Sequence, residues 1–160
     1  MKLKIKIKKL YQDLPMPKVL DVGDWIDLYA AEDVTIQHKG GSVYVSLGVA
    51  MQLPDGYEAI VAPRSSTPKK FGFTVPNSIG VIDNSYCSND DIWKCPAYCI
   101  KNGGTTIHFG DRICQFRVQL SQKATVWQKI KWLFTSGIEF VEVQTLEGKT
   151  RGGFGSTGTK

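Results

Sequence analysis

The sequence has no apolar run approaching the ~18 residues that a membrane-spanning helix needs, and no apolar segment follows its first lysines as in a secretion signal. We therefore expect a cytoplasmic protein that contacts no membrane. Cysteine is also scarce, and without a secretion signal we expect no disulfides. The cysteine spacings match no common zinc pattern, although His108 lies nearby in the sequence. We predict reduced thiols, with a metal site as the alternative, at Cys87, Cys95, Cys99 and Cys114.

Acidic residues are outnumbered, at 15 against 20 lysines and arginines, which gives a formal net charge of +5. Five of the lysines lie within the first nine residues, where four of them alternate with apolar residues such as Leu3, Ile5 and Ile7. This period of two predicts a half-exposed strand, whose lysines also discourage edge pairing. A nucleic-acid-binding arm is the alternative. Aromatic residues and arginine are missing from the segment, so we expect no nucleic-acid partner.

Long helical patterns are rare, and turn signals recur at short intervals, as at Pro54-Asp55-Gly56 and Lys101-Asn102-Gly103-Gly104. Between the turns lie short alternating stretches. Apolar residues alternate with small or polar ones over residues 43–51, and every second residue is apolar over residues 114–120. A chain of 160 residues usually forms one domain. We therefore predict a single all-β domain, built as a sandwich, barrel or jelly roll.

Residues 121–137 break the β pattern. Ser121 is placed to cap the start of a helix and Gly137 its end, so we predict a helix of two to three turns inserted between two strands. Trp127 and Trp132 cannot both lie on one narrow stripe of this helix. We expect the helix to pack on the β core; the alternative is a protein-docking surface, because exposed aromatic residues anchor interfaces. The apolar residues at helical spacing are Val126, Ile130, Leu133 and Phe134.

Two polar segments carry residues suited to nucleotide chemistry. In Pro63-Arg64-Ser65-Ser66 an arginine fork and hydroxyls follow an apolar strand, which suits phosphate oxygens, although many polar loops have this composition. Asp83 follows an apolar pair, Val81-Ile82, that we expect to be buried, and such a carboxylate can act as a general base toward water. A turn-capping aspartate is the alternative. Nearby, Asn77 has the donor and acceptor to read a pyrimidine edge, and the Tyr86 ring offers a flat surface for a sugar.

Two later segments add polar groups. Gln115 must point away from the apolar row of Cys114 and its strand neighbours, while Asp111 and Arg112 are expected to form structural ion pairs. The glycine-rich residues 151–158 can approach a ligand closely and resemble a phosphate clamp. A frayed tail is the alternative for this segment. Its candidate ligand contacts are Arg151, Phe154, Ser156 and Thr157.

Taken in order, these segments resemble the five motifs of the deoxyuridine triphosphatase (dUTPase) family in its homotrimeric form. The resemblance covers residues ~20 to 160, nearly the whole chain. The corresponding segments are residues 24–33, 63–66, 77–86, 110–115 and 151–158.

The resemblance implies an all-β, jelly-roll-like dUTPase fold in residues 1–150, with a short helical insert at about 122–136 (segment 121–137) and a flexible arm, residues 151–160, that acts as a mobile lid. It also implies hydrolysis of dUTP to dUMP and pyrophosphate with Mg²⁺ on the triphosphate, which limits uracil incorporation into DNA and supplies dUMP. Three chains would build each site of a homotrimer. We expect the lid to close over the site of a neighbouring subunit.

The family's site roles carry over by position. Asp83 would activate the water that attacks the α-phosphorus, and Asp27 would meet the magnesium through ordered water. Asn77 and the backbone of Val81 and Ile82 would hold uracil and sugar, with Tyr86 under the deoxyribose. Phosphate contacts would come from Arg64, Ser65, Ser66 and Gln115. Phe154 would cover the uracil, while the γ-phosphate end would be held by Arg151, Ser156 and Thr157.

The chain departs from the family pattern in three places. After Tyr86 the expected glycine is missing, and Cys87-Ser88-Asn89-Asp90-Asp91 follows. Trp25-Ile26 replaces the small residue and glycine expected before Asp27. In the last motif Lys149 occupies the usual position of the arginine, so either Lys149 or Arg151 contacts the γ-phosphate. The two are not equivalent, because arginine is bidentate, and comparing KM for dUTP between the two alanine variants would distinguish them.

Two alternative functions stay open from the sequence. A dCTP deaminase, or a bifunctional relative, would share the fold and the triphosphate site. A dUTP-responsive regulatory protein would bind a partner through the insert at 121–137. Inserts of this kind occur in virus-borne members of the family, so a bacteriophage or bacterial origin is expected.

Overall fold

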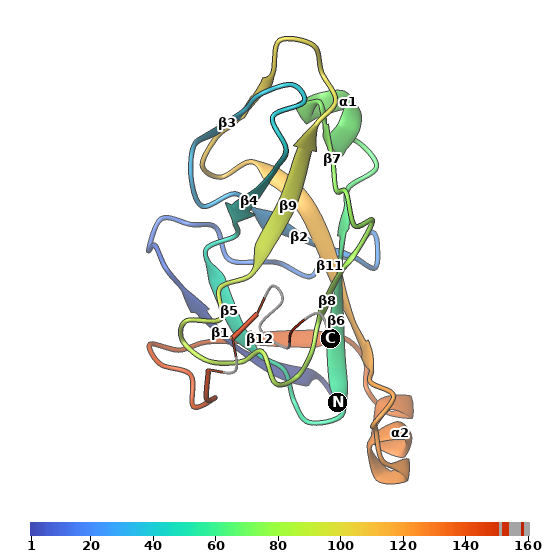
Figure 1. Ribbon diagram of the computed structural model, residues 1–160. Helices are drawn as coiled ribbons and strands as arrows, with labels where there is room; N and C mark the ends of the chain where they lie inside the picture. Colours follow the sequence, from blue (N-terminus) through green and yellow to red (C-terminus); the bar gives the residue numbers. More distant parts are fainter. Residues whose placement is uncertain (151, 154–157, 159–160) are drawn as a thin grey trace.

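The computed structural model describes residues 1–150, 152–153 and 158, and it is built mainly of β-strands (Figure 1). The prediction of an all-β fold is therefore confirmed. Two short helices, α1 (Thr67–Phe71) and α2 (Val126–Leu133), interrupt the strands.

Within the described residues the strands form four sheets. One has the order β12 (Ile138–Glu142), β1 (Leu3–Lys9), β5 (Val49–Gln52). A second pairs β10 (Thr105–Ile107) with β3 (Val34–Ile36). A third has the order β4 (Ser42–Ser46), β9 (Lys94–Cys99), β7 (Phe73–Thr74).

The fourth sheet carries most of the polar residues of interest. Its order is β2 (Ile26–Tyr29), β11 (Arg112–Leu120), β6 (Tyr57–Pro63), β8 (Gly80–Ile82), with antiparallel neighbours throughout. Along β11 the side chains of Cys114, Phe116 and Val118 are buried, while Gln115 is on the other face, as its alternation predicts. The rings of Trp93 and Phe116, both fully buried, pack edge to face at 5.3 Å between centroids.

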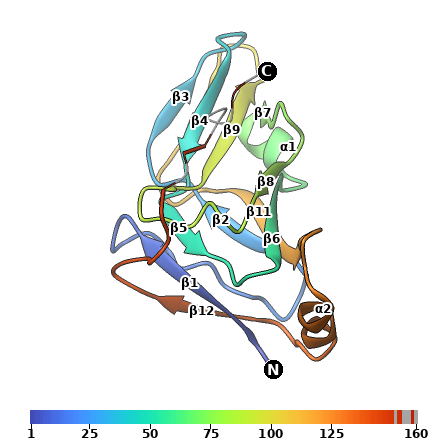
Figure 2. The ribbon, with the colours of Figure 1, turned by 60° about the horizontal axis from the view of Figure 1, so that its bottom comes forward.

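Strand β1 has the predicted alternation, because Leu3, Ile5 and Ile7 are buried and the lysines between them face outward. It is not an edge strand, however. β12 pairs with it in parallel on one side and β5 in antiparallel on the other, and Figure 2 shows β1 and β12 side by side. Lys6 forms an ion pair with Glu147 at 3.1 Å, and Lys9 one with Glu142 at 3.8 Å. These lysines thus contact the C-terminal part of the same chain.

The alternating stretch over residues 43–51 is two strands rather than one. Gly48 separates β4 from β5, which lie in different sheets. Its φ of +63° is in the left-handed region, and an added Cβ would lie 2.5 Å from the Ala31 Cβ. Glycine is therefore required where the chain leaves one sheet for the other.

The predicted helix in the 121–137 segment exists but is shorter than expected. It begins after Thr125, not Ser121: the Thr125 hydroxyl accepts from the Gln128 N–H, and the Gln128 side chain accepts from the Thr125 N–H. This reciprocal capping box starts the helix at Val126. The helix ends at the cap residue Phe134, three residues before Gly137.

The expectation that the helix packs on the β core holds for one face only. The Trp132 ring lies 5.5 Å from that of Tyr57, whereas Trp127 is 79% exposed. The two tryptophans thus lie on different faces, as predicted. The helical row of apolar residues was expected to be buried and is exposed instead, because Trp132 and Gln128 make the contacts that orient the helix. Figure 1 shows α2 projecting from the end of the β body.

The four cysteines are free thiols, which confirms the prediction that they are reduced. Burial raises the pKa of the Cys114 thiol well above its usual range, and the neighbouring Cys95 adds to this effect. The Cys114 thiol therefore stays protonated and unreactive in the core. Of the helices described, neither has the length and apolarity to cross a membrane.

Candidate functional site

Arg64 follows the end of β6 and points toward the neighbouring strands of the sheet. Its Nε lies 2.7 Å from Oδ1 of Asp27 on β2, and Arg112 on β11 approaches the other Asp27 oxygen at 3.2 Å. The Asp27 side chain is only 15% exposed, so this three-residue cluster is partly screened from water. Asp27 thus fixes the direction of two cationic forks at one edge of the sheet. The expected ion pair of Arg112 is confirmed, whereas the Asp111 carboxylate accepts the His108 backbone N–H.

A bulge in β11 explains how Arg112 reaches Asp27. The pairing register with β2 shifts between Arg112 and Cys114, so Ile113 and Cys114 are both buried. Such an extra residue bends the strand and redirects its neighbours. Arg112 is left on the outer side, beside Asp27.

Thr67 holds the loop that carries Arg64, Ser65 and Ser66. Its hydroxyl donates to the Ile113 carbonyl at 2.9 Å and accepts the Arg64 N–H at 3.0 Å, and the side chain is fully buried. The loop is thereby tied to β11. The Ser66 hydroxyl makes no hydrogen bond as the cap of α1, and Ser65 is exposed. Ser66 is half-buried.

Gln115 lies between the two strands of this cluster. In the strand pairing it is opposite Asp27 on one side and Ala62 on the other, and its Nε2 donates to the Pro63 carbonyl at 3.2 Å. The predicted phosphate-binding residues and the predicted magnesium contact, Asp27, are thus brought together by β2, β6 and β11. These residues are Asp27, Arg64, Ser65, Ser66 and Gln115.

A second group gathers around the end of β8. A cavity of about 220 Å³ is lined by Asn77, Val81, Ile82, Asp83 and Tyr86, all of which were predicted from the sequence to bind nucleotide. The Tyr86 hydroxyl donates to the Ile92 carbonyl at 3.1 Å, which fixes the ring. The rest of the wall is formed by Tyr44, Gly80, Lys94, Pro96 and Gly153.

One sequence expectation fails at β8, because Val81 is 60% exposed rather than buried. Among the described residues β8 is the edge strand of its sheet and pairs with β6 alone, which leaves the Val81 side chain exposed. The turn before it depends on Ser78, whose φ is +64°, and on the Ser78 N–H donating to the Val75 carbonyl. This turn brings Asn77 to the cavity.

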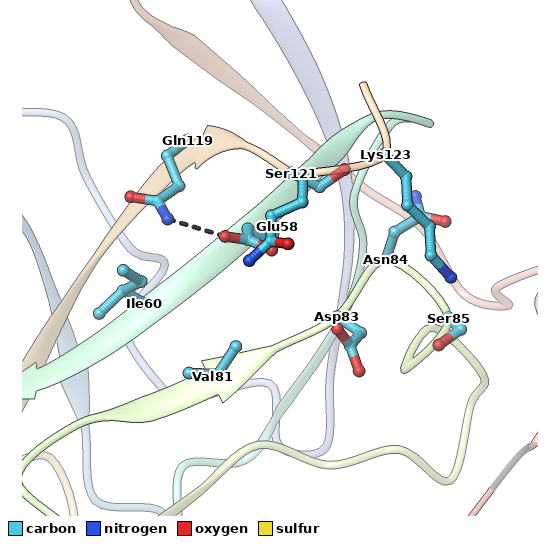
Figure 3. Close-up of a pocket in the computed structure, with 10 residues that line it drawn as sticks. Glu58, Ile60, Val81, Asp83, Asn84, Ser85, Gln119, Ser121 and Lys123 are labelled. Atoms are coloured by element: carbon cyan, nitrogen blue, oxygen red, sulfur yellow. Dashed lines mark hydrogen bonds between the residues drawn. The ribbon is translucent and has the colours of Figure 1, made fainter. Parts of the chain in front are cut away.

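Asp83 also lines a larger cavity of about 640 Å³, whose wall includes Val81 as well (Figure 3). Glu58 and Gln119 on neighbouring strands form a 2.7 Å hydrogen bond across its wall. Lys123 places a cation in the same cavity, and Figure 3 shows its side chain on the side of Asn84 and Ser85.

The two groups lie at opposite ends of the strand pair β6–β8. Ile82 is opposite Ala59, and Asp83 continues from there toward Glu58. Arg64 lies five residues beyond Ala59 in the other direction, which is about 17 Å along an extended strand. Neither cavity at Asp83 is lined by Arg64 or Gln115. The chain thus carries two half-sites, one with the carboxylate and one with the arginines.

The donor set decides what kind of magnesium site the chain can provide. Within the described residues, His, Cys, Asp and Glu side chains form no group of three or more that could hold a metal ion. Asp27 is a single carboxylate that already pairs with two arginines. Magnesium commonly keeps several waters and binds through one or two carboxylates together with substrate phosphates. The residues fit a magnesium ion carried by a triphosphate and contacted through water.

Most of the predicted tail contacts lie outside the described residues, namely Arg151, Phe154, Ser156 and Thr157. The described part still shows where the tail begins. Gly153 lines the 220 Å³ cavity of its own chain, and a Cβ added to it would lie 2.9 Å from the Tyr86 ring. The expectation that the tail serves a neighbouring subunit stays a prediction. Lys149 is exposed.

Several site residues were missed in the sequence. Asn84 donates to the Leu53 and Pro54 carbonyls and so holds the segment after Asp83, but a single asparagine in a turn gives no distinguishing signal. Tyr44 and Lys94 reach the smaller cavity from β4 and β9. The alternation of β4 indicated that Tyr44 faces away from the core. That it reaches this cavity depends on the pairing of β4 with β9, which the local sequence does not reveal.

Comparison with known proteins identifies the arrangement. The family model of dUTPase matches residues 21–158. A SPbeta prophage-derived deoxyuridine 5'-triphosphate nucleotidohydrolase of Bacillus subtilis (strain 168) is 48% identical over 158 residues, which cover 99% of this chain and 100% of that protein.

Solved structures agree. The dUTPase from Streptococcus mutans has a TM-score of 0.65 at 25% identity, covering 75% of this chain and 98% of that one. A mutant dUTPase from phage phi11 of S. aureus has a TM-score of 0.65 at 16% identity, covering 76% and 94%, and its structure describes the coordination of a structural Mg(II) ion. The predicted jelly-roll-like fold is thereby confirmed.

Proposed function

The chain belongs to the dUTPase family, and we propose that it hydrolyses dUTP to dUMP and pyrophosphate with Asp83 as the general base. The activity is that of a dUTP diphosphatase, an enzyme of nucleotide metabolism that limits uracil incorporation into DNA and supplies dUMP. The observation that carries the residue assignment is the 220 Å³ cavity, in which Asp83 meets Asn77 and Tyr86.

Asp83 takes the proton of a water molecule as that water attacks the α-phosphorus. The carboxylate stands at the end of β8, where the two cavities meet, and it is therefore accessible to both substrate and water. The Tyr86 N–H donates to the Asp83 carbonyl at 3.0 Å, so a tight turn sets the direction of the residue. A positioned carboxylate of this kind contributes about 10²–10⁴-fold to the rate.

The base and sugar occupy the smaller cavity in this proposal. The Asn77 amide and the backbone of Val81 and Ile82 read the uracil edge, and the Tyr86 ring packs under the deoxyribose. Because the Tyr86 hydroxyl is bonded to the Ile92 carbonyl, the ring cannot turn away to admit a ribose 2′-hydroxyl. Preference for deoxyribose then follows from a fixed wall.

The triphosphate is bound by the second half-site. Arg64 and the Ser65 and Ser66 hydroxyls contact phosphate oxygens, with Gln115 beside them. Asp27 holds Arg64 in place and contacts the triphosphate-bound Mg²⁺ through water. The ion, when bound, neutralises phosphate charge. Residues 151–160 form the lid, and the γ-phosphate end is held by Arg151 or Lys149 with Ser156 and Thr157, while Phe154 covers the uracil.

The separation of the two half-sites within one chain supports a homotrimer. Within one chain Asp83 and Arg64 are about 20 Å apart by strand geometry, because Asp83 lies at the level of Glu58, six residues from Arg64, and this is too far to act on the same α-phosphate region of one dUTP. A second copy that supplies its Arg64 half-site to the Asp83 cavity of the first completes the site, and rotational symmetry repeats the contact until the ring closes.

Pyrophosphate release from dUTP, with dTTP, dCTP and UTP as controls, tests the function. We expect release from dUTP alone among the four, because Asn77 and Tyr86 select base and sugar. Ammonia release from dCTP would instead support the deaminase alternative. The family match gives no support to deamination, and Glu58, the glutamate nearest in the pairing to Asp83, is bonded to Gln119.

We further propose that the helix α2 binds an acidic protein partner. The exposed apolar face of α2, here called the α2 face, consists of Val126, Trp127, Ile130, Leu133 and Phe134. Trp127 and Leu133 are each 79% exposed, and large contiguous apolar patches mark interaction sites. Gln128 donates to the Asp55 carbonyl at 2.9 Å, so the helix is fixed in this orientation.

Charge selects the occupant of the α2 face. No aspartate or glutamate occurs between Asp111 and Glu139, whereas Lys123, Lys129 and Lys131 lie on or beside the helix. A second copy docked through the same face would bring these lysines together and be repelled. An acidic protein with an apolar contact surface is complementary to both features.

Substitutions on the α2 face or at the lysines beside it should weaken binding of that partner without affecting hydrolysis. For a partner recovered with the intact chain, we expect Leu133→Ser and the pair Lys129→Glu, Lys131→Glu each to raise Kd at least about tenfold at unchanged kcat. Ile100→Ser is the matched control, since Ile100 is 49% exposed at the far end of β9. Titration calorimetry measures Kd. Equal binding by the charge-reversed pair, self-association abolished by Leu133→Ser, or binding only to anionic lipid vesicles would each contradict the proposal.

A further inference from the structure

The turn between β5 and β6 is bonded to the residue that follows Asp83. This turn comprises residues 53–56 and is here called the 53–56 turn. Asn84 is half-buried, and its Nδ2 donates to two successive carbonyls, that of Leu53 at 2.9 Å and that of Pro54 at 3.0 Å. The amide nitrogen carries two N–H groups, one for each carbonyl. Because Leu53 is only 3% exposed, Asn84 is attached to a part of the turn that belongs to the core.

The other two carbonyls of the 53–56 turn are bonded by the 121–137 insert. Gln128 Nε2 of α2 donates to the Asp55 carbonyl at 2.9 Å, and the Ser121 N–H donates to the Gly56 carbonyl at 2.9 Å. Gly56 has a φ of +85°, and a Cβ added to it would collide with the Gln128 amide. Glycine is therefore required where the turn meets α2. All four carbonyls thus have a donor, two from the residue after Asp83 and two from the insert.

Asp83 is fixed from both sides by this arrangement. Before it, β8 ends at Ile82 and is paired with β6. After it, Asn84 is held to the 53–56 turn, and the Tyr86 N–H donates to the Asp83 carbonyl. The start of the insert reaches the same place, since Asp83 and Ser121 both line the 640 Å³ cavity (Figure 3).

We propose that Asn84 and Gln128 are positioning residues for hydrolysis, and that the 53–56 turn connects α2 to the carboxylate of Asp83. The proposal rests on the assignment of Asp83 as the general base. Asn84 sets the direction of the backbone after Asp83, and Gln128 holds the row of carbonyls from the other side. A general base must lie within hydrogen-bond reach of the water that it activates, so a small displacement lowers the rate. The insert then supports the catalytic segment of its own chain.

Paired substitutions test whether Gln128 acts through Asn84. We expect Asn84→Ala to lower kcat for dUTP about tenfold and Gln128→Ala about threefold. KM should stay within about twofold in both, because Asn77 and Tyr86 still bind the nucleotide. In the Asn84→Ala background, Gln128→Ala should change kcat by less than about 1.5-fold, since the turn no longer holds the segment after Asp83. A threefold loss from Gln128→Ala in both backgrounds, or a rise in KM in place of the fall in kcat, would overturn the proposal.

Amide hydrogen exchange at Tyr86 measures the positioning without any substrate. This N–H donates to the Asp83 carbonyl at 3.0 Å, and we expect its exchange to be at least about fivefold faster in Asn84→Ala. Exchange at the rate of the parent would contradict the role of Asn84, whatever the kinetics. A parent that does not hydrolyse dUTP would refute the proposed function itself, whereas a parent that hydrolyses dUTP as fast as both variants would refute the positioning role alone.

Two matched controls separate positioning from the loss of a polar side chain. Gln12→Ala and Asn102→Ala shorten an exposed glutamine and an exposed asparagine that lie outside the 53–56 turn, the insert and both cavities at Asp83. Both variants should keep the kcat, the KM and the Tyr86 exchange rate of the parent. A loss of kcat in these controls equal to that of the matched variants would show a general effect on the fold and contradict the proposal.

Discussion

Replacing Asp83 by asparagine is expected to lower kcat for dUTP by about 10²–10⁴-fold while KM changes little. The amide keeps the shape of the side chain and one acceptor oxygen, but it cannot take the proton of the attacking water. Asn77 and Tyr86 still bind the nucleotide, because the turn that carries them depends on backbone groups and on the Tyr86–Ile92 hydrogen bond. Steady-state pyrophosphate release gives kcat and KM, and calorimetry with a non-hydrolysable dUTP analogue gives the affinity.

The matched control for this variant is Asp13→Asn. Asp13 is an exposed aspartate outside both cavities, so its substitution removes the same charge without affecting contacts to the nucleotide. Asp83 is also exposed, and we expect both variants to keep the thermal midpoint of the parent within a few degrees. Turnover of Asp83→Asn close to that of the parent would remove Asp83 from the role of general base. A parallel loss of kcat and affinity would show instead that the side chain binds substrate.

Local patterns predicted the elements whose side chains alternate regularly, and they failed where the chain changes sheet. The first strand was predicted from the alternation of its lysines with apolar residues, and in the structure each of those apolar residues is buried. The apolar alternation of residues 43–51 continues through Gly48, so the pattern could not reveal that the strand ends there. That break depends on Ala31 and Leu14, which approach Gly48 from elsewhere in the chain. Contacts of this kind have no signature in the local sequence.

The helix shows the same limit from another side. Its existence followed from apolar spacing, but its start depends on whether a hydroxyl finds a reciprocal partner three residues later. Thr125 has Gln128 in that position, whereas Ser121 has Ala124. Which face would be buried could not be predicted, because it depends on Trp132 meeting Tyr57 across the sheet.

The candidate site was predictable as a set of residues and not as an arrangement. Motif order identified Asp83 and Arg64 together, yet the strand register separates them within the chain. The departures from the family pattern after Tyr86 were visible in the sequence. Their contacts could not be predicted, because Asn89 and Ser88 bond Leu146 and Thr150 from a distant part of the sequence.

Deleting residues 151–160 is expected to lower kcat for dUTP by about 100-fold or more and to leave the thermal midpoint nearly unchanged. The deletion removes the arginine, the hydroxyls and the aromatic ring assigned to the triphosphate and uracil, and preorganised donors of this type are each worth about 10²–10³ in kcat. A closing segment also excludes water from the reacting phosphate. The fold should persist, because Leu146, the last buried apolar residue among those that the structure describes, and its bonds to Asn89 remain.

The oligomeric state separates loss of the lid from loss of assembly in that deletion. Sedimentation of the shortened chain should match that of the parent, since the half-sites at Arg64 and Asp83 lie outside the deleted residues. Full turnover in the shortened chain would contradict the lid, and dissociation would show that the tail serves assembly instead.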